Sequence, residues 1–252
     1  MKSIFKVFVL LIALSTTSCN RYFRIHTKTS QTTAVTDSLP ESELSRRVAT
    51  YINPLHDSLD AKMSTVIVQS AKRLTKGQPE SDLGNLIADL MLATARQKTG
   101  KMIDIAVTNN GGIRAELPQG GVTIGNVYEI MPFDNELVIL TLSGSTMQKF
   151  ANYIAQRREP QAGMELVIDK NTNQVLDLKI GGQPLDLTRN YTVVTGDYVA
   201  NGGDRAEFLK ERISNQPLNL LMRDAYLAYF KEKGLKGEVL DPKKDGRTRF
   251  EQ

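Results

Sequence analysis

The chain of 252 residues contains one cysteine, two histidines and no tryptophan. With Cys19 as its single cysteine, the chain cannot form an internal disulfide. Catalytic patterns of the Ser-His-Asp, Cys-His and Walker types are also missing from the sequence. These absences argue against a self-contained serine, cysteine or P-loop hydrolase.

An apolar run from Val7 to Leu14 follows Lys2 and Lys6, and small residues precede Cys19. This layout is typical of a secretory signal, and the run is too short to span a bilayer. Residues 1–18 are therefore expected to be a lipoprotein signal peptide. The Thr-Thr-Ser before the cysteine resembles a bacterial lipobox, which would make Cys19 the lipidated first residue of a protein anchored in the cell envelope, facing the periplasm or the outside. The alternative is an ordinary cleavage site that happens to precede a cysteine.

Cleavage after residue 18 leaves 30 basic residues against 28 acidic ones, a formal charge near +2. Such a balance gives no reason to expect a nucleic-acid partner. Residues 19–40 are rich in Ser, Thr and Gln and indicate a tether, although Tyr22, Phe23 and Ile25 could pair as an edge strand. Residues 41–252 show no internal repeat and no second boundary, so one domain is expected there.

Apolar spacing predicts helices and strands along this domain. The expected helices are 42–63 with a kink or break at Pro54, Leu83 to a stop at Gly100, 144–157 and about 218–233. The expected strands are 64–70, 103–108, 136–143, 191–195 and a hairpin of 164–169 with 174–180, whose Leu176, Leu178 and Ile180 would share one face. This mixture of hairpins and helical crossovers predicts an α+β domain, a mixed β-sheet with flanking helices.

Three segments carry residues suited to binding a ligand. They are "TNNGGIR" with Asn109 and Arg114, "IMPFDNEL" with Phe133, and "YVANGGD" with Tyr198 and Asp204. Each has a purely structural alternative: a turn, an aromatic lid on the core, or a strand ending in a turn. Taken together, two aromatic rings and an acid suit a nucleoside, because rings stack on a base and one carboxylate can accept from both ribose hydroxyls.

The motifs "ESDLGNLIADLM", "NNGGIR", "GVTIGNVYEIMPFDNEL" and "YVANGGD", in this order, resemble the C-terminal domain of the 5′-nucleotidases and UDP-sugar hydrolases. The resemblance runs from about Glu80 to the end of the chain. It implies that Phe133 and Tyr198 sandwich the base and that Asp204 holds the ribose. It also implies that Asn109 and Arg114 contact the ribose and phosphate. Family members commonly carry a further arginine ahead of "LGNLI", where this chain has "TKGQPESD". Arg73 or Lys76 could substitute for it, and we assign that role to neither.

In this family the phosphate ester is hydrolysed by a separate N-terminal metallophosphoesterase domain with two metal ions. His26 and His56 lie in neither an Asp-x-His nor a Gly-Asn-His context, and the residues ahead of Glu80 are too few for such a domain. The resemblance therefore implies a nucleotide-recognition half that contains no catalytic or metal-binding residues of its own. Divalent metals are expected in a partner metallophosphoesterase chain. The alternative is a non-catalytic envelope lipoprotein that binds nucleosides or nucleotides.

Overall fold

The structure is a computed structural model that describes residues 27–32 and 42–251. The chain divides after Thr50 into two units. Helix α2 (Glu43–Met63) spans this division and buries none of its side chains. Of the expected kink or break at Pro54, the break is wrong, because the helix continues through this residue. The expected signal peptide, the lipidation site Cys19 and the alternative edge strand at Tyr22 to Ile25 lie outside the described residues.

The second unit is built on a five-stranded sheet with the order β10-β4-β9-β2-β5. Strands β2 and β9 run parallel, and the other neighbouring pairs run antiparallel. The α+β class with a mixed sheet is therefore confirmed. The five strands are β2 (Ile105–Val107), β4 (Glu136–Ser143), β5 (Gln161–Ala162), β9 (Asn190–Gly196) and β10 (Ser214–Leu221).

Both faces of this sheet are buried. In β4, Leu137 and Ile139 join one apolar core, whereas Val138 and Leu140 join the core on the opposite face. Helices α3 (Asp82–Thr99) and α7 (Met222–Leu235) supply the first core, and α5 (Gly144–Arg157) supplies the second. Because both sides are covered, β4 is a nearly continuous apolar run rather than an alternating one.

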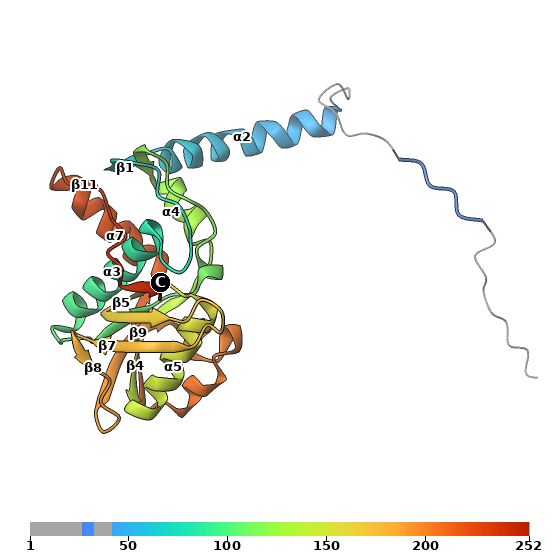
Figure 1. The fold of residues 1–252 in the computed structure, drawn as a ribbon. Helices are drawn as coiled ribbons and strands as arrows, with labels where there is room; N and C mark the ends of the chain where they lie inside the picture. Colours follow the sequence, from blue (N-terminus) through green and yellow to red (C-terminus); the bar gives the residue numbers. More distant parts are fainter. Residues whose placement is uncertain (1–26, 33–41, 252) are drawn as a thin grey trace, which may run out of the picture. The chain divides into compact units, whose positions relative to one another are not determined.

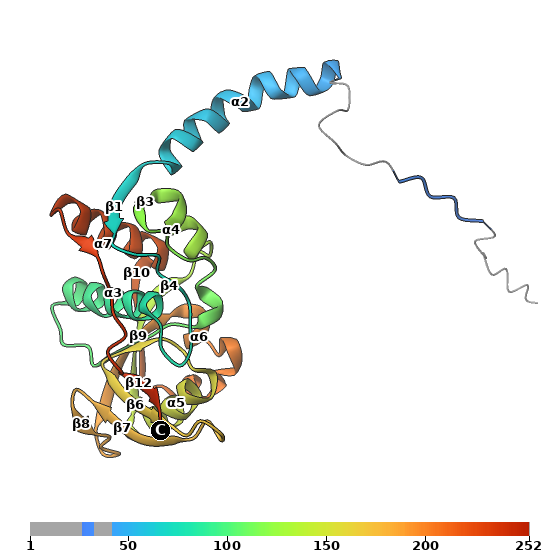
Figure 2. The same ribbon diagram turned by 45° about the horizontal axis from the view of Figure 1, so that its top comes forward.

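Two smaller sheets complete the unit. Their orders are β11-β1-β3 and β12-β6-β7-β8, and Figures 1 and 2 show the second on the α5 side of the molecule. Their strands are β1 (Val66–Ser70), β3 (Gly120–Thr123), β6 (Met164–Ile168), β7 (Val175–Ile180), β8 (Gln183–Pro184), β11 (Val239–Leu240) and β12 (Thr248–Phe250). The predicted β6-β7 hairpin is confirmed. Leu178 and Ile180 are buried as expected, but Leu176 near the start of β7 is 47% exposed.

Helix α3 begins and ends where its sequence predicts. The Ser81 hydroxyl accepts the backbone N–H of Gly84 at 3.0 Å, and Gly100 takes the left-handed conformation, with φ of 65°, that ends the helix. Asn85 donates to the Glu80 carboxylate at 2.6 Å and to the Lys243 carbonyl at 3.0 Å. The "LGN" segment therefore ties the start of its helix to the C-terminal end of the chain.

The expected start of the last helix near Leu218 is wrong. Residues 214–221 form the edge strand β10, and α7 begins only at Met222. Strand β10 pairs with β4, and Pro217 is compatible with this position because an edge strand leaves some backbone N–H groups unpaired. Tertiary pairing thus outweighs the local pattern of leucines.

Candidate functional site

Three chain segments meet at one edge of the central sheet. Since β2 and β9 are parallel, their carboxyl ends lie at the same edge. Strand β4 is antiparallel to β9 and begins at that edge, where Leu137 pairs with Gly196. The segments that follow β2 and β9 and the segment that precedes β4 are therefore neighbours, as is typical of ligand sites at strand ends in open sheets.

A cavity of about 360 Å³ lies between these segments. All five residues predicted from the sequence line it. The sequence interpretation did not single out Asn135, which follows the "PFD" of its motif. The full lining consists of Asn109, Gly111, Gly112, Arg114, Phe133, Asn135, Tyr198 and Asp204.

Asp204 is held in place by polar contacts from two other segments. The Asn109 side-chain amide donates to Asp204 Oδ2 at 2.6 Å, and Arg157 Nη2 lies 3.6 Å from Oδ1. Asp204 itself has a φ of 54°, a left-handed conformation that aspartate tolerates better than most residues. A carboxylate has about four acceptor positions, so the contacts leave Asp204 able to accept hydrogen bonds from a ligand.

The two glycines before Asp204 serve different purposes. Gly202 has a φ of 99°, a backbone conformation in which a residue with a side chain would be strained. Gly203 has no such φ, but a Cβ atom there would lie 2.6 Å from the Tyr198 ring and from the Tyr198 carbonyl oxygen. The ring therefore packs directly on the Gly203 backbone. Gly112 has a similar role, since its Cβ would lie 2.7 Å from Asn109 Oδ1.

Phe133 lies in the loop between α4 (Ile124–Ile130) and β4, and a residue of α7 secures this loop. Arg223 donates through Nη1 to the carbonyl of Phe133 at 3.2 Å, and its Nη2 bonds the Asp134 carboxylate at 2.6 Å. As whole residues, Phe133 is 41% exposed and Tyr198 is 49% exposed. Two large aromatic side chains thus remain available at the cavity, and Tyr198 does so from the short helix α6 (Asp197–Ala200).

Arg114 is the one basic residue among the lining side chains. It is exposed, donates to the Gly111 carbonyl at 3.3 Å, and holds its guanidinium carbon 5.8 Å from the centre of the Phe133 ring. Arg73 pairs with Glu116 at 2.8 Å, and Lys76 donates to the Ile113 carbonyl at 3.2 Å. Neither residue lines the cavity, so the positive charge of the cavity lining comes from Arg114.

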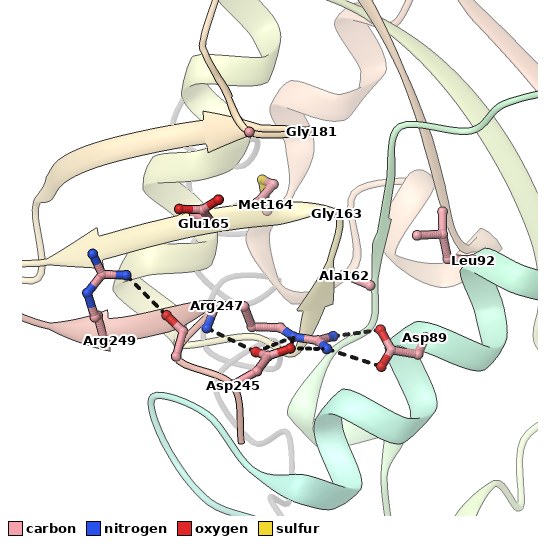
Figure 3. Close-up of a pocket in the computed structure, with 12 residues that line it drawn as sticks. Asp89, Leu92, Ala162, Gly163, Met164, Glu165, Gly181, Asp245, Arg247 and Arg249 are labelled. Atoms are coloured by element: carbon pink, nitrogen blue, oxygen red, sulfur yellow. Dashed lines mark hydrogen bonds and ion pairs between the residues drawn. The ribbon is translucent and has the colours of Figure 1, made fainter. Parts of the chain in front are cut away.

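A second cavity, of about 420 Å³, lies beside Arg247 (Figure 3). The Arg247 guanidinium bonds Asp89 at 2.6 and 3.1 Å and Asp245 at 2.7 Å, and it also donates to the Gln161 carbonyl. These partners occupy the donors of the guanidinium, so little is left for a ligand. The network instead joins α3 to the C-terminal segment and has a structural role.

Replacing Arg247 by methionine is expected to change the acid sensitivity of the fold. The hydrogen bond from Arg247 lowers the pKa of Asp245 from 3.8 to about 2. A depressed carboxyl pKa stabilises the fold above pH 3.8, and this contribution is lost as the pH falls towards 2. Arg247→Met should therefore lower stability at pH 6 and flatten the decline between pH 4 and 2. Urea unfolding across this range measures both effects.

Arg249→Met is the matched control, because the Arg249 side chain is exposed and donates to the Gly246 carbonyl rather than to Asp245. It should keep the pH profile of the wild type. If Arg247→Met also keeps that profile, the Asp245 contact contributes nothing to acid stability.

No group of three or more His, Cys, Asp or Glu side chains within residues 27–32 and 42–251 is arranged to hold a metal ion. Nor does any helix in the same ranges have the length and apolarity needed to cross a membrane.

Comparison with known proteins agrees with the fold. The family "5′-nucleotidase, C-terminal domain" matches residues 60–211. The trifunctional nucleotide phosphoesterase protein YfkN of Bacillus subtilis is 30% identical over 230 residues, which are 85% of this chain and 15% of that protein. Protein UshA of Escherichia coli is 27% identical over 71% of this chain and 32% of its own length. The crystal structure of the 5′-nucleotidase precursor of Thermus thermophilus matches with a TM-score of 0.69 at 30% identity, covering 82% of this chain and 43% of that chain.

The chain belongs to the 5′-nucleotidase family and carries its C-terminal domain. The match begins at residue 60, about twenty residues before the motifs that indicated it, and ends at residue 211. The chain spans less than half the length of these relatives.

Proposed function

We propose that the cavity binds the nucleoside part of a nucleotide. The base lies between Phe133 and Tyr198, and the ribose hydroxyls donate to Asp204. Asn109 and Arg114 lie towards the ribose and the phosphate. The observation that carries this proposal is the convergence of two exposed rings, a carboxylate and an arginine on one cavity at the edge of the sheet. A flat apolar base and a diol are the chemical complement of this set.

We further propose that the chain acts as the nucleotide-recognition half of a split 5′-nucleotidase. A separate metallophosphoesterase chain, with its own divalent metal ions, would hydrolyse the phosphate ester. Lipidation at Cys19 would anchor the protein in the bacterial envelope. Two halves anchored to one membrane have a raised effective concentration, so a weak interface between them suffices.

Isothermal titration of the purified protein with adenosine, AMP and UDP-glucose, with and without Mn²⁺, tests the binding proposal. We expect binding of at least one of these ligands that does not require the metal, because the described residues offer no metal site. Absence of heat with all three ligands would overturn the nucleoside assignment for the isolated protein.

The split-enzyme proposal needs a separate experiment. Purified protein is mixed with a candidate metallophosphoesterase from the same organism, and phosphate release from AMP is measured in Mn²⁺. We expect the mixture to release phosphate faster than either protein alone. Binding of nucleosides without any gain on mixing would favour the non-catalytic binding lipoprotein instead.

Substitution of Arg114 separates phosphate from nucleoside recognition. Because Arg114 is the one basic side chain lining the cavity, Arg114→Gln should raise the Kd for AMP by roughly tenfold, the usual loss of one charged hydrogen bond. The Kd for adenosine, which has no phosphate, should change by less than about twofold. An equal rise in Kd for both ligands would show that Arg114 maintains the structure of the cavity and does not bind the phosphate. Titration of the two ligands provides the measurement.

A further inference from the structure

A buried carboxylate contacts the "NNGG" segment, which contributes to the cavity lining. Glu159 follows the end of α5, and only 1% of its surface is exposed. Both of its oxygens accept hydrogen bonds: Oε2 from the backbone N–H of Asn110 at 2.6 Å, and Oε1 from Nε of Arg157 at 2.7 Å. Neither Glu159 nor Arg157 lines the cavity.

Two chains of contacts lead from Glu159 to Asp204. The first runs through Arg157, whose Nη2 lies 3.6 Å from Asp204 Oδ1. The second runs through the backbone of Asn110 to its neighbour Asn109, whose amide donates to Asp204 Oδ2. Each oxygen of Asp204 thus contacts a residue that Glu159 bonds directly, as for Arg157, or whose neighbour it bonds, as for Asn109.

A buried charge needs a reason, because well-packed apolar side chains of similar volume often stabilise a fold equally well. Burial raises the pKa of Glu159, while the Asn110 amide and Arg157 oppose this shift. The other ionisable side chains near Glu159 are Asp204 and Tyr153. The contacts of Glu159 therefore point towards the ligand-facing carboxylate rather than into the apolar core.

We propose that Glu159 and Arg157 are positioning residues that set the orientation of the Asp204 carboxylate for the ribose hydroxyls. This inference rests on the proposed nucleoside function of the cavity. It gives the ion pair between the buried Glu159 and Arg157 a role in ligand specificity, and it explains why the turn after α5 is joined to the "NNGG" segment.

The test compares adenosine with 2′,3′-dideoxyadenosine, which lacks both ribose hydroxyls. A carboxylate accepts on both oxygens, whereas an amide accepts on one only. Glu159→Gln must therefore lose either the Asn110 or the Arg157 contact. We expect its Kd for adenosine to rise about tenfold and its Kd for dideoxyadenosine to change less than about twofold. Glu165→Gln makes the same chemical change at an exposed position and should leave both Kd values unaltered.

Arg157→Gln provides a second variant in case Glu159→Gln fails to fold, because the Arg157 side chain is 37% exposed. It should show the same selective loss for adenosine. If these variants retain the wild-type ratio of the two Kd values, the positioning role is overturned, even where thermal stability falls. If the wild-type protein binds neither nucleoside, the proposed function itself fails and the inference fails with it.

Discussion

Replacing Tyr198 by alanine is expected to weaken adenosine binding by about tenfold to a hundredfold. Removing an aromatic ring that stacks on a base costs about 1–3 kcal/mol, and every 1.4 kcal/mol corresponds to about a tenfold change in Kd. The loss should extend to bases other than adenine, because stacking tolerates different bases. Tyr198→Phe keeps the ring and should bind nearly as tightly as the wild type. Titration of the three proteins with adenosine provides the measurement.

Tyr51→Ala is a suitable control, since Tyr51 is a largely exposed tyrosine on α2 that does not line the cavity. Phe133→Ala should match the effect of Tyr198→Ala if the base lies between both rings. If Phe133→Ala and Tyr198→Ala both keep the full affinity for adenosine, the proposal that the cavity binds a nucleoside is wrong. The assignment of the fold to the family would be unaffected.

The parts of the fold that the sequence predicts are those whose pattern reflects local burial. Helix α3 combines a helical apolar face with a serine cap and a terminal glycine, and these signals lie within the segment itself. Strand β10 carries no such signal, because four of its first five residues are exposed and its pairing with β4 comes from a distant part of the chain. The leucines at the end of β10 adjoin the start of α7, so the boundary between the strand and the helix depends on tertiary contacts.

The candidate site divides in the same way. Its lining residues lie in short segments rich in glycine, asparagine and aromatic residues, and the ends of three strands bring these segments together. The residues that hold the lining in place carry no comparable signal. Arg223 reaches the Phe133 loop from α7, and Glu159 reaches Asn110 from the turn after α5. From sequence alone, an arginine on a helix or a glutamate in a turn is predicted to be an exposed surface residue.

Gly203→Ala is expected to impair binding at least as strongly as the loss of the Tyr198 ring. The added methyl would lie 2.6 Å from the ring and from the Tyr198 carbonyl oxygen, a distance that real Cβ atoms do not adopt. The segment must therefore shift, and it carries both the ring and the neighbouring Asp204. We expect the Kd for adenosine to rise by more than about tenfold. The cost in folding stability should be about 1–3 kcal/mol, as for other overpacked sites.

Gly77→Ala is the matched control, because its Cβ would meet no atom closer than 3.4 Å. A double-mutant cycle then identifies the cause of the Gly203 effect. If the methyl acts partly by displacing the ring, Gly203→Ala should weaken binding less in a Tyr198→Ala background than in the wild type. Additive losses would mean that the methyl acts through the Tyr198 carbonyl and the backbone alone. In that case Gly203 would maintain the turn, and the ring would play no part in the requirement for glycine.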